Sequence, residues 1–300
     1  MSINSSQTLE KNSSRNGALS AISAYVLWGF APLYFKLLAD IAPAEILMHR
    51  VVWSSVILLV MIIAMRNWSQ LVAVLKQPKL VINLSLSASF LAVNWFLFIW
   101  AVNNDHLLDA SLGYYINPLF NVVLGMLFFQ ERLRRNQLIA VGLAFIGVLI
   151  QLIALGTLPL ISIVLAATFG IYGLIRKKLA VNSFVGLFVE SMLMLPLAVI
   201  YWCYFINSNT SDMSLNTNTL NTTLIMAGIV TTAPLLCFTA AAKRLTLSTL
   251  GFFQYLGPSI MFILATFYYQ ETLQTAELIT FICIWSALAI YSLDSLKKRS

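Results

Sequence analysis

Apolar residues form ten runs of about twenty along this chain of 300 residues, and short polar segments separate the runs. A helix needs about 20 apolar residues to cross the ~30 Å hydrocarbon core of a bilayer. Every backbone polar group inside that layer must be paired internally, so a spanning segment is either a helix or a strand of a closed barrel. These runs are too long and too uniformly apolar for the alternating pattern of barrel strands. We therefore predict an all-α polytopic membrane protein with ten transmembrane helices, at residues 18–39, 45–65, 80–102, 108–129, 136–154, 158–176, 183–206, 221–242, 247–269 and 275–294.

The composition excludes a soluble domain. Hydrophobic residues make up 60% of the chain and charged residues 10%, whereas a soluble domain has about 25% charged residues. The three cysteines, Cys203, Cys237 and Cys283, lie inside apolar runs without CxxC spacing, so we expect reduced thiols. No HExxH, GxSxG, P-loop or GxGxxG motif lies on a suitable element, and there are only two histidines. We therefore predict no metal site, no cofactor and no ATP hydrolysis by this chain.

The basic residues predict the orientation in the membrane. Lys and Arg concentrate in cytoplasmic loops, and with the N-terminus inside, the inner segments hold sixteen of the eighteen. The other two, Lys36 and Arg50, lie within spans near the outer edge. We therefore expect both termini to be cytoplasmic, and the net charge of +7 needs no nucleic-acid partner. The inner residues are Lys11, Arg15, Arg66, Lys76, Lys79, Arg132, Arg134, Arg135, Arg176, Lys177, Lys178, Lys243, Arg244, Lys297, Lys298 and Arg299.

One stretch of the chain occurs twice. Residues 112–133 and 250–273 both open with Leu-Gly-aromatic-aromatic and close with aromatic-aromatic-Gln-Glu. Their prolines, Pro118 and Pro258, lie 140 residues apart, close to half the chain, which indicates a duplicated unit. Five spans per half is an odd number, so the second copy is expected to insert upside down. The predicted division is a flexible cytoplasmic tail at 1–16, repeats at 17–154 and 155–296, and a basic cytoplasmic tail at 297–300.

Inverted repeats are a common construction of transporters, whose substrate site lies between the repeats near the middle of the membrane. A duplicated channel is the alternative. Helices broken at matching positions mark such a site, and a proline inside a helix removes one backbone hydrogen bond and kinks it. We therefore predict helix kinks at Pro118 and Pro258. Polar and aromatic residues near these prolines and in the first and third spans are candidates for the cavity wall, although aromatic residues at this spacing also occur in ordinary helix packing. The candidates are Trp28, Asn94, Trp95, Tyr114, Tyr115, Asn117, Gln254 and Tyr255.

Charged residues inside the predicted spans suggest gates. A charge at mid-span costs at least ~2.5–3.5 kcal/mol on insertion scales. Glu45 and His49 are four residues apart and share a helix face, with Arg50 next to them and Lys36 at the end of the preceding span. The functional interpretation is an electrostatic lining or gate at the outer mouth of a cavity. In the structural interpretation, Arg50 and Lys36 reach the outer headgroups and Glu45 pairs with one of them.

Glu190 lies about seven residues into the seventh span, or ~10 Å at helical rise. The register that aligns Lys36 with Lys177 also aligns His49 with Glu190. Glu190 is therefore a candidate gate or proton-coupling residue, and the alternative is a carboxyl group kept neutral by desolvation and bonded to a neighbouring helix. The repeated Glu131 and Glu271 lie where spans end, and we interpret both as helix-boundary residues, because a carboxylate stabilises a helix N-terminus.

The chain resembles the RarD subfamily of EamA proteins, within the drug/metabolite transporter superfamily. The resemblance implies a ten-helix bacterial inner-membrane carrier with two EamA repeats and a central cavity lined by spans 1, 3, 4, 6, 8 and 9. RarD-like proteins carry a label that links them to chloramphenicol sensitivity, and the resemblance supplies no catalytic residues. The stretches that carry it are 25–38 (YVLWGFAPLYFKLL), 45–54 (EILMHRVVWS), 94–104 (NWFLFIWAVNN), 109–119 (DASLGYYINPL), 230–245 (VTTAPLLCFTAAAKRL) and 247–258 (LSTLGFFQYLGP).

From these observations we predict a secondary active transporter that exports a small organic metabolite or drug-like solute by alternating access between the two repeats. Its partners would be the lipid bilayer, the solute and protons as the candidate coupling ion. One alternative is an intramembrane enzyme that uses Glu45 and His49 on a lipid-linked substrate. Another is a non-transporting sensor or partner protein.

Overall fold

The computed structural model describes residues 2–103, 107–156, 160–204, 210, 212–268, 270 and 275–297, and the regular structure of these residues is helical. Ten helical segments are long and apolar enough to cross a membrane, which confirms the prediction of ten spans. The helices are α1 (Ser2–Lys36), α2 (Pro43–Ala64), α3 (Trp68–Leu75), α4 (Pro78–Asn103), α5 (Leu107–Phe129), α6 (Arg135–Leu155), α7 (Leu160–Lys178), α8 (Ser183–Tyr204), α9 (Asn218–Arg244), α10 (Leu247–Gln254), α11 (Leu256–Ile263), the π-helix η1 (Leu264–Tyr268) and α12 (Thr275–Lys297).

Two helical segments were not expected from the sequence. The segment expected as a flexible tail is helical from Ser2 onward, because an established helix extends at the gain of one hydrogen bond per residue. The short helix α3 lies between the second and third spans, where we expected a loop. It buries Leu71 and Val74, three residues apart, and exposes Trp68 and Leu75.

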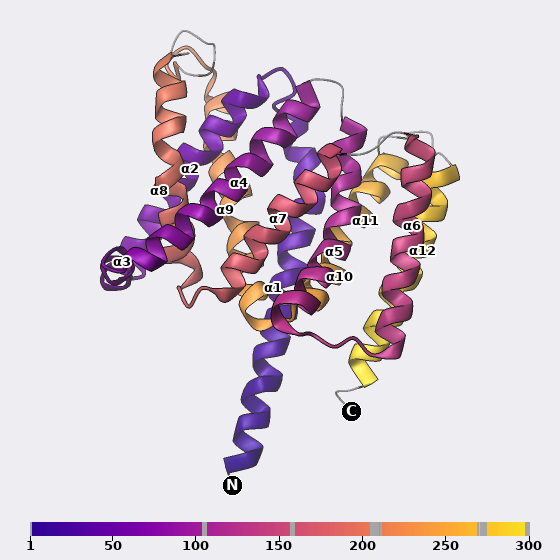
Figure 1. The fold of residues 1–300 in the computed structure, drawn as a ribbon. Coiled ribbons are helices and arrows are strands. Elements are labelled where there is room, and N and C mark those ends of the chain that lie inside the picture. Colours follow the sequence, from indigo (N-terminus) through magenta and orange to yellow (C-terminus); the bar gives the residue numbers. More distant parts are fainter. Residues whose placement is uncertain are drawn as a thin grey trace.

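The two halves of the chain interleave. Helix α1 packs on α9 and α11 of the second half, and α7 packs on α4 and α5 of the first half. Each span of the first half has a counterpart five spans later in the chain. Replacing every helix by its counterpart converts the contacts of α1 into the contacts of α7. The contacts between α2 and α8, α5 and α10, and α6 and α12 each join a helix to its own counterpart, so this replacement leaves them unchanged. Both termini lie at the same end of the bundle (Figure 1), which is consistent with two halves that cross the layer in opposite directions. This packing is the one expected for inverted repeats.

Two glycines at matching positions allow the halves to approach closely. Gly29 of α1 faces Ile260 of α11, and Gly170 of α7 faces Phe120 of α5. A Cβ atom on either glycine would lie 2.7 Å from the side chain that it faces. Small residues at crossings are typical of membrane helices, whose association depends on close packing because lipid supplies no hydrophobic driving force.

The ninth span is divided where the sequence predicts a kink. Helix α10 ends at Gln254, and α11 begins at Leu256, two residues before Pro258. Proline has no backbone N–H and cannot bond the carbonyl four residues earlier, which is that of Gln254. Helix α5, in contrast, continues as one helix through Pro118.

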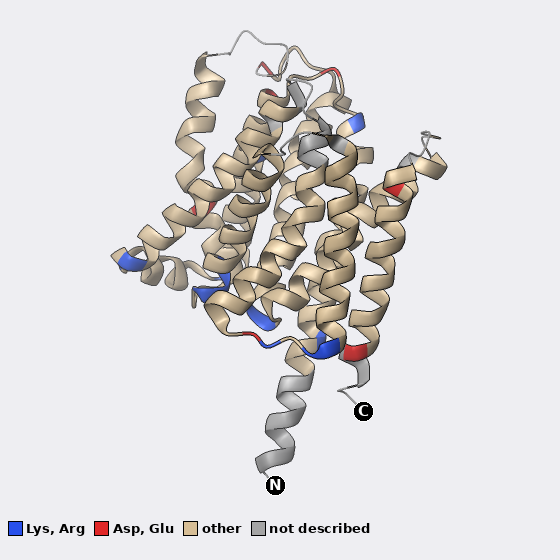
Figure 2. Cartoon of the chain, turned by 45° about the vertical axis from the view of Figure 1, so that its right-hand side comes forward, with Lys and Arg blue, Asp and Glu red and all other residues tan. Residues whose placement is uncertain are grey.

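Lys and Arg positions gather at the end of the bundle where both termini lie, as the blue segments of Figure 2 show. The residues at this end include Arg134 and Arg135 at the start of α6, Lys177 and Lys178 at the end of α7, and Arg244 at the end of α9. Lys36 lies at the end of α1, on the opposite side.

Replacing Gly228 of α9 with alanine is expected to lower the apparent Tm of the purified protein. A Cβ atom there would lie 2.6 Å from the backbone carbonyl carbon of Trp53 in α2, which cannot move without shifting the helix. Overpacking of this kind costs about 1–3 kcal/mol. Gly142→Ala is the matched control, since nothing lies within 4 Å of its Cβ position and alanine favours a helix. Equal effects of the two substitutions would contradict the proposed close crossing.

Candidate functional site

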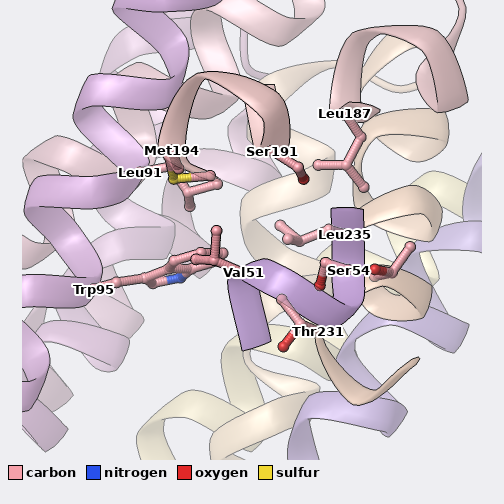
Figure 3. A pocket seen from close by; sticks show the side chains of 10 residues that line it. Val51, Ser54, Leu91, Trp95, Leu187, Ser191, Met194, Thr231 and Leu235 are labelled. Carbon is pink, nitrogen blue, oxygen red and sulfur yellow. The ribbon is translucent and has the colours of Figure 1, made fainter. Parts of the chain in front are cut away.

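A small cavity lies between the pseudo-symmetric helix pairs α2/α8 and α4/α9. Its volume, about 10 Å³, leaves room for about one water molecule. Figure 3 shows side chains from all four helices pointing into it. The lining residues are Val51, Ser54, Leu91, Trp95, Leu187, Ser191, Met194, Thr231, Thr232 and Leu235.

Hydroxyl groups interrupt the apolar wall of this cavity. Ser54 donates a hydrogen bond to the backbone oxygen of Gly228 at 3.3 Å, and Thr231 accepts one from Arg50. Thr232 Oγ1 is buried without a hydrogen-bond partner among the described residues, and Ser191 is also buried. An apolar wall with a few polar groups is typical of a site for a small organic molecule, but such sites measure about 300–1,000 Å³, so the four helices would have to separate before this cavity could hold one.

Arg50 is not a lining residue, but it contacts two residues of the cavity wall, Thr231 and Trp95. Its Nε donates to Thr231 Oγ1 at 2.8 Å. Its guanidinium carbon lies 4.9 Å from the ring centroid of Trp95 and 5.5 Å from that of Phe35. These cation–π contacts hold the guanidinium between two aromatic faces and partly replace the water that a cation loses inside the bundle.

A buried ion pair also lies near the cavity. Arg176 Nη1 of α7 is 3.6 Å from Glu190 Oε1 of α8, and both side chains are 0% exposed. Glu190 comes directly before the cavity residue Ser191. Gly186, one turn earlier on α8, leaves the space that the guanidinium occupies, because a Cβ atom there would overlap it. Lys243 of α9 is close enough to interact electrostatically with both members of the pair.

Glu45 and His49, which the sequence places on one helix face, both contact Thr210 of the connection between α8 and α9. The Thr210 hydroxyl donates to the Glu45 carboxylate, and His49 Nε2 lies 3.2 Å from the Thr210 backbone oxygen. The His49 ring also packs edge-on against Trp202, with centroids 5.4 Å apart. These contacts fasten Thr210 to α2, at the end of the bundle at which Lys36 is exposed.

Trp95 is the one predicted cavity residue that lines this cavity, and the other seven lie in helix contacts elsewhere. Trp28 packs in an aromatic cluster, 5.8 Å from the centroid of its repeat counterpart Phe169. Asn94 donates to the backbone oxygen of Leu165 and to Thr168 Oγ1, each at 2.9 Å. The spans lining this cavity are 2, 3, 7 and 8, of which the family resemblance implied only 3 and 8.

The remaining candidates connect the fourth and ninth spans or lie beside this contact. Asn121 donates to Asn117 Oδ1 at 3.1 Å and to Gln254 Oε1 at 2.9 Å. The hydroxyl of Tyr255 donates to the backbone oxygen of its counterpart Tyr115 at 3.3 Å. Tyr114 is 41% exposed, and its ring stands edge-on to Phe98 with centroids 6.1 Å apart.

Glu131 binds a helix N-terminus, as its interpretation as a boundary residue predicts. It accepts hydrogen bonds from the backbone N–H of Leu247 at 2.7 Å, and from the N–H and hydroxyl of Ser248 at 2.9 and 2.7 Å. The helix that it caps is α10 of the other half. Its counterpart Glu271 lies outside the described residues.

Ser54, Ser191 and Arg176 were not among the site residues predicted from the sequence. The register that aligns His49 with Glu190 matches span 2 with span 7, but it aligns Ser191 with Arg50 and Ser54 with Leu195, so it contained no signal for the two serines.

In the sequence, Arg176 stands in one basic stretch with Lys177 and Lys178. We counted all three as cytoplasmic residues that indicate the orientation in the membrane. Only the fold shows that its side chain turns inward to Glu190.

Comparison with known proteins finds relatives along nearly the whole chain. Residues 15–153 match the model of the EamA-like transporter family. An uncharacterized transporter of Vibrio cholerae is 54% identical over 97% of this chain and 96% of its own. Protein RarD of Escherichia coli is 51% identical over 96% of this chain and 97% of its own. A solved crystal structure with 19% identity covers 92% of this chain and 97% of its own at a TM-score of 0.71, which supports the fold.

Breaking the Arg176–Glu190 pair is expected to destabilise the protein strongly. Glu190→Met or Arg176→Met alone leaves an uncompensated buried charge, at a cost of about 3–5 kcal/mol, whereas the double substitution regains most of the loss. Unfolding of the four proteins measures this coupling as a double-mutant cycle.

Asp294→Asn is the control, because the Arg134–Asp294 pair is 3.0 Å long but its arginine side chain is 42% exposed. Solvent at the arginine screens this pair, so its contribution is closer to the about 0–1 kcal/mol of surface pairs than to that of a fully buried pair. Simple addition of the two single effects in the double variant would mean that Arg176 and Glu190 do not stabilise each other.

Proposed function

Because this chain belongs to the RarD subfamily of the EamA-like transporters, it is a membrane transporter and not an enzyme, and we propose that it is a secondary active exporter of a small organic solute. This places it in the drug/metabolite transporter superfamily. The enzyme hypothesis for Glu45 and His49 is therefore wrong, and the contacts of both residues with Thr210 give them a structural role.

The observation that carries the proposal is the position of the cavity. It lies between helix pairs that exchange under the repeat symmetry, where inverted-repeat transporters bind their substrates. It also has hydroxyl groups in its wall and charged groups near it.

Contacts between the two halves lie at both ends of the bundle. At the Lys36 end, the Tyr34 hydroxyl of α1 donates to the backbone oxygen of Thr223 in α9 at 2.7 Å. At the other end, Glu131 binds Ser248 at the start of α10. Alternating access would open one set of contacts while keeping the other. Because the halves interleave, the moving parts are helices of both halves, with the break at Tyr255 as a hinge in the ninth span.

We further propose that the two repeats are inverted and that the protein lies in the bacterial inner membrane with both termini in the cytoplasm. The gathering of Lys and Arg at the terminal end supports this orientation. Protons are the proposed coupling ion, and Glu190 is the first candidate to carry them, followed by Glu45. Protonation of Glu190 would remove the charge that holds Arg176 and so would loosen α7 from α8.

Filling the cavity is expected to stop export. Cells that produce the wild-type protein should release at least one organic solute at a higher level than cells lacking it, in an untargeted comparison of the medium. Ser191→Phe should abolish the difference, because its side chain would occupy the space between the four helices. Val123→Phe, at a position that is 49% exposed on the outside of the bundle, should preserve it. If no solute changes with the wild-type protein, the transport proposal fails.

Glu190→Gln is expected to uncouple transport from protons. In proteoliposomes with an imposed pH gradient, wild-type protein should accumulate the solute found above, whereas the variant should only equilibrate it. Asp212→Asn is the control, since Ser214 hydrogen bonds hold the pKa of Asp212 below its usual value and keep it ionised at neutral pH. Normal proton-driven accumulation by Glu190→Gln would remove this role from Glu190 and leave Glu45 as the candidate.

A further inference from the structure

The short helix α3 lies crosswise to the membrane-spanning helices. Figure 1 shows it nearly end-on, whereas α8 runs up and down the page. It connects the second span to the third and packs against α4. Its eight residues are too few to cross a bilayer, so α3 lies along the surface of the hydrocarbon layer.

Two apolar stripes run along α3. Leu71 and Val74 form the stripe that is buried against the bundle. Trp68, Val72 and Leu75 follow the spacing i, i+4, i+7 and share a second face. On this face, Trp68 is 56% exposed and Leu75 is 53% exposed. Such a stripe is unfavourable in water, and tryptophan is enriched at the headgroup level of membranes, so the second stripe fits the upper part of the acyl chains.

Three basic residues flank this stripe. Arg66 stands just before α3, and Lys76 and Lys79 follow it, all with exposed side chains. None of the three forms an ion pair or a side-chain hydrogen bond with a residue that the structure describes. The sequence from Val51 to Asn104 also contains no Asp or Glu. Lys and Arg next to an apolar stripe extend to the phosphate level, where they attract anionic headgroups.

The backbone at Arg66 indicates that its side chain has a role outside the fold. Arg66 ends α2 with a left-handed φ of 52°. Its N–H donates to the carbonyl oxygen of Ile63 at 3.1 Å, and the N–H of Asn67 donates to that of Ile62 at 2.9 Å. Glycine is the usual residue at this position of the motif, because a Cβ atom disfavours left-handed backbone. Folding alone would therefore favour glycine here.

We propose that α3 and its flanking cations Arg66, Lys76 and Lys79 form a binding surface for anionic phospholipids. The exposed stripe from Trp68 to Leu75 contacts the acyl chains, and the cations contact the phosphate and the other headgroup oxygens. A zwitterionic lipid carries its own compensating cation and binds less tightly. This surface is separate from the cavity, so the proposal does not depend on transport or on the solute.

Native mass spectrometry of the delipidated protein in an uncharged detergent tests the proposal. The probes are phosphatidylglycerol and phosphatidylcholine with the same acyl chains, and the wild type should bind the first more tightly. Each basic residue near the headgroups should contribute about fivefold to this preference. Combining Arg66→Gly, Lys76→Gln and Lys79→Gln should therefore abolish it. Equal binding of the two lipids by the wild type would overturn the proposal.

Arg66→Gly separates the charge from the fold. It should lower the affinity for phosphatidylglycerol about fivefold and leave that for phosphatidylcholine unchanged, while glycine keeps the apparent Tm at or above that of the wild type. Gln130→Gly is the matched control, since Gln130 is exposed, is uncharged and has a φ of 53°. It should leave both lipid affinities unchanged. An undiminished preference for phosphatidylglycerol in Arg66→Gly and in the triple variant would place the lipid site elsewhere and overturn the assignment.

Two further measurements distinguish a lipid from a soluble anion. Inorganic phosphate should not displace phosphatidylglycerol, because it has no acyl chain to cover the exposed stripe. Trp68→Gln should weaken the binding of both lipids, because it removes apolar surface that the two share. Displacement by phosphate, or unchanged lipid binding in Trp68→Gln, would show that the acyl chains do not lie on α3 and would overturn the proposed lipid surface.

Discussion

A charged side chain inside a membrane requires a partner, and this constraint accounts for much of the structure. Arg176 and Glu190 are fully buried and face each other across α7 and α8. The space for the arginine depends on Gly186, so a backbone position without a side chain is part of the same arrangement. Breaking such a pair is far more costly than never forming it. The two helices are therefore held together by a charge as well as by packing.

Arg50 meets the same constraint without a carboxylate. Two aromatic faces and one hydroxyl surround its guanidinium, and all three come from different helices, α1, α4 and α9. The cavity lies near both arginines. The charge of Arg176 is compensated by a carboxylate of the chain, and the charge of Arg50 has no such partner among the described residues.

Interleaving of the halves gives the bundle its stability and restricts its motion. Equivalent glycines, Gly29 and Gly170, allow α1 and α7 to cross helices of the opposite half at equivalent places. Asn94 and Asn121 bond across other contacts between the halves. Neither half can move as a separate block, since the most extensive helix pairs combine both halves. The movement that exposes the cavity must therefore occur at helix ends and at the break in the ninth span.

Local patterns in the sequence determined the spans, because the thickness of the hydrocarbon layer sets the length of every apolar run. They also predicted the duplication and the break near Pro258, since a missing N–H acts within four residues. Partners were decided by the tertiary structure. Arg176 lies in a basic stretch that indicates a cytoplasmic loop, yet its side chain pairs with a buried carboxylate. Tyr114 lies in a conspicuous aromatic pair that predicts a cavity wall, yet it does not line the cavity. Such pairings depend on the rotation and register of helices distant in sequence. Hydropathy does not encode these quantities, so the cavity between α2, α4, α8 and α9 became visible only in the assembled bundle.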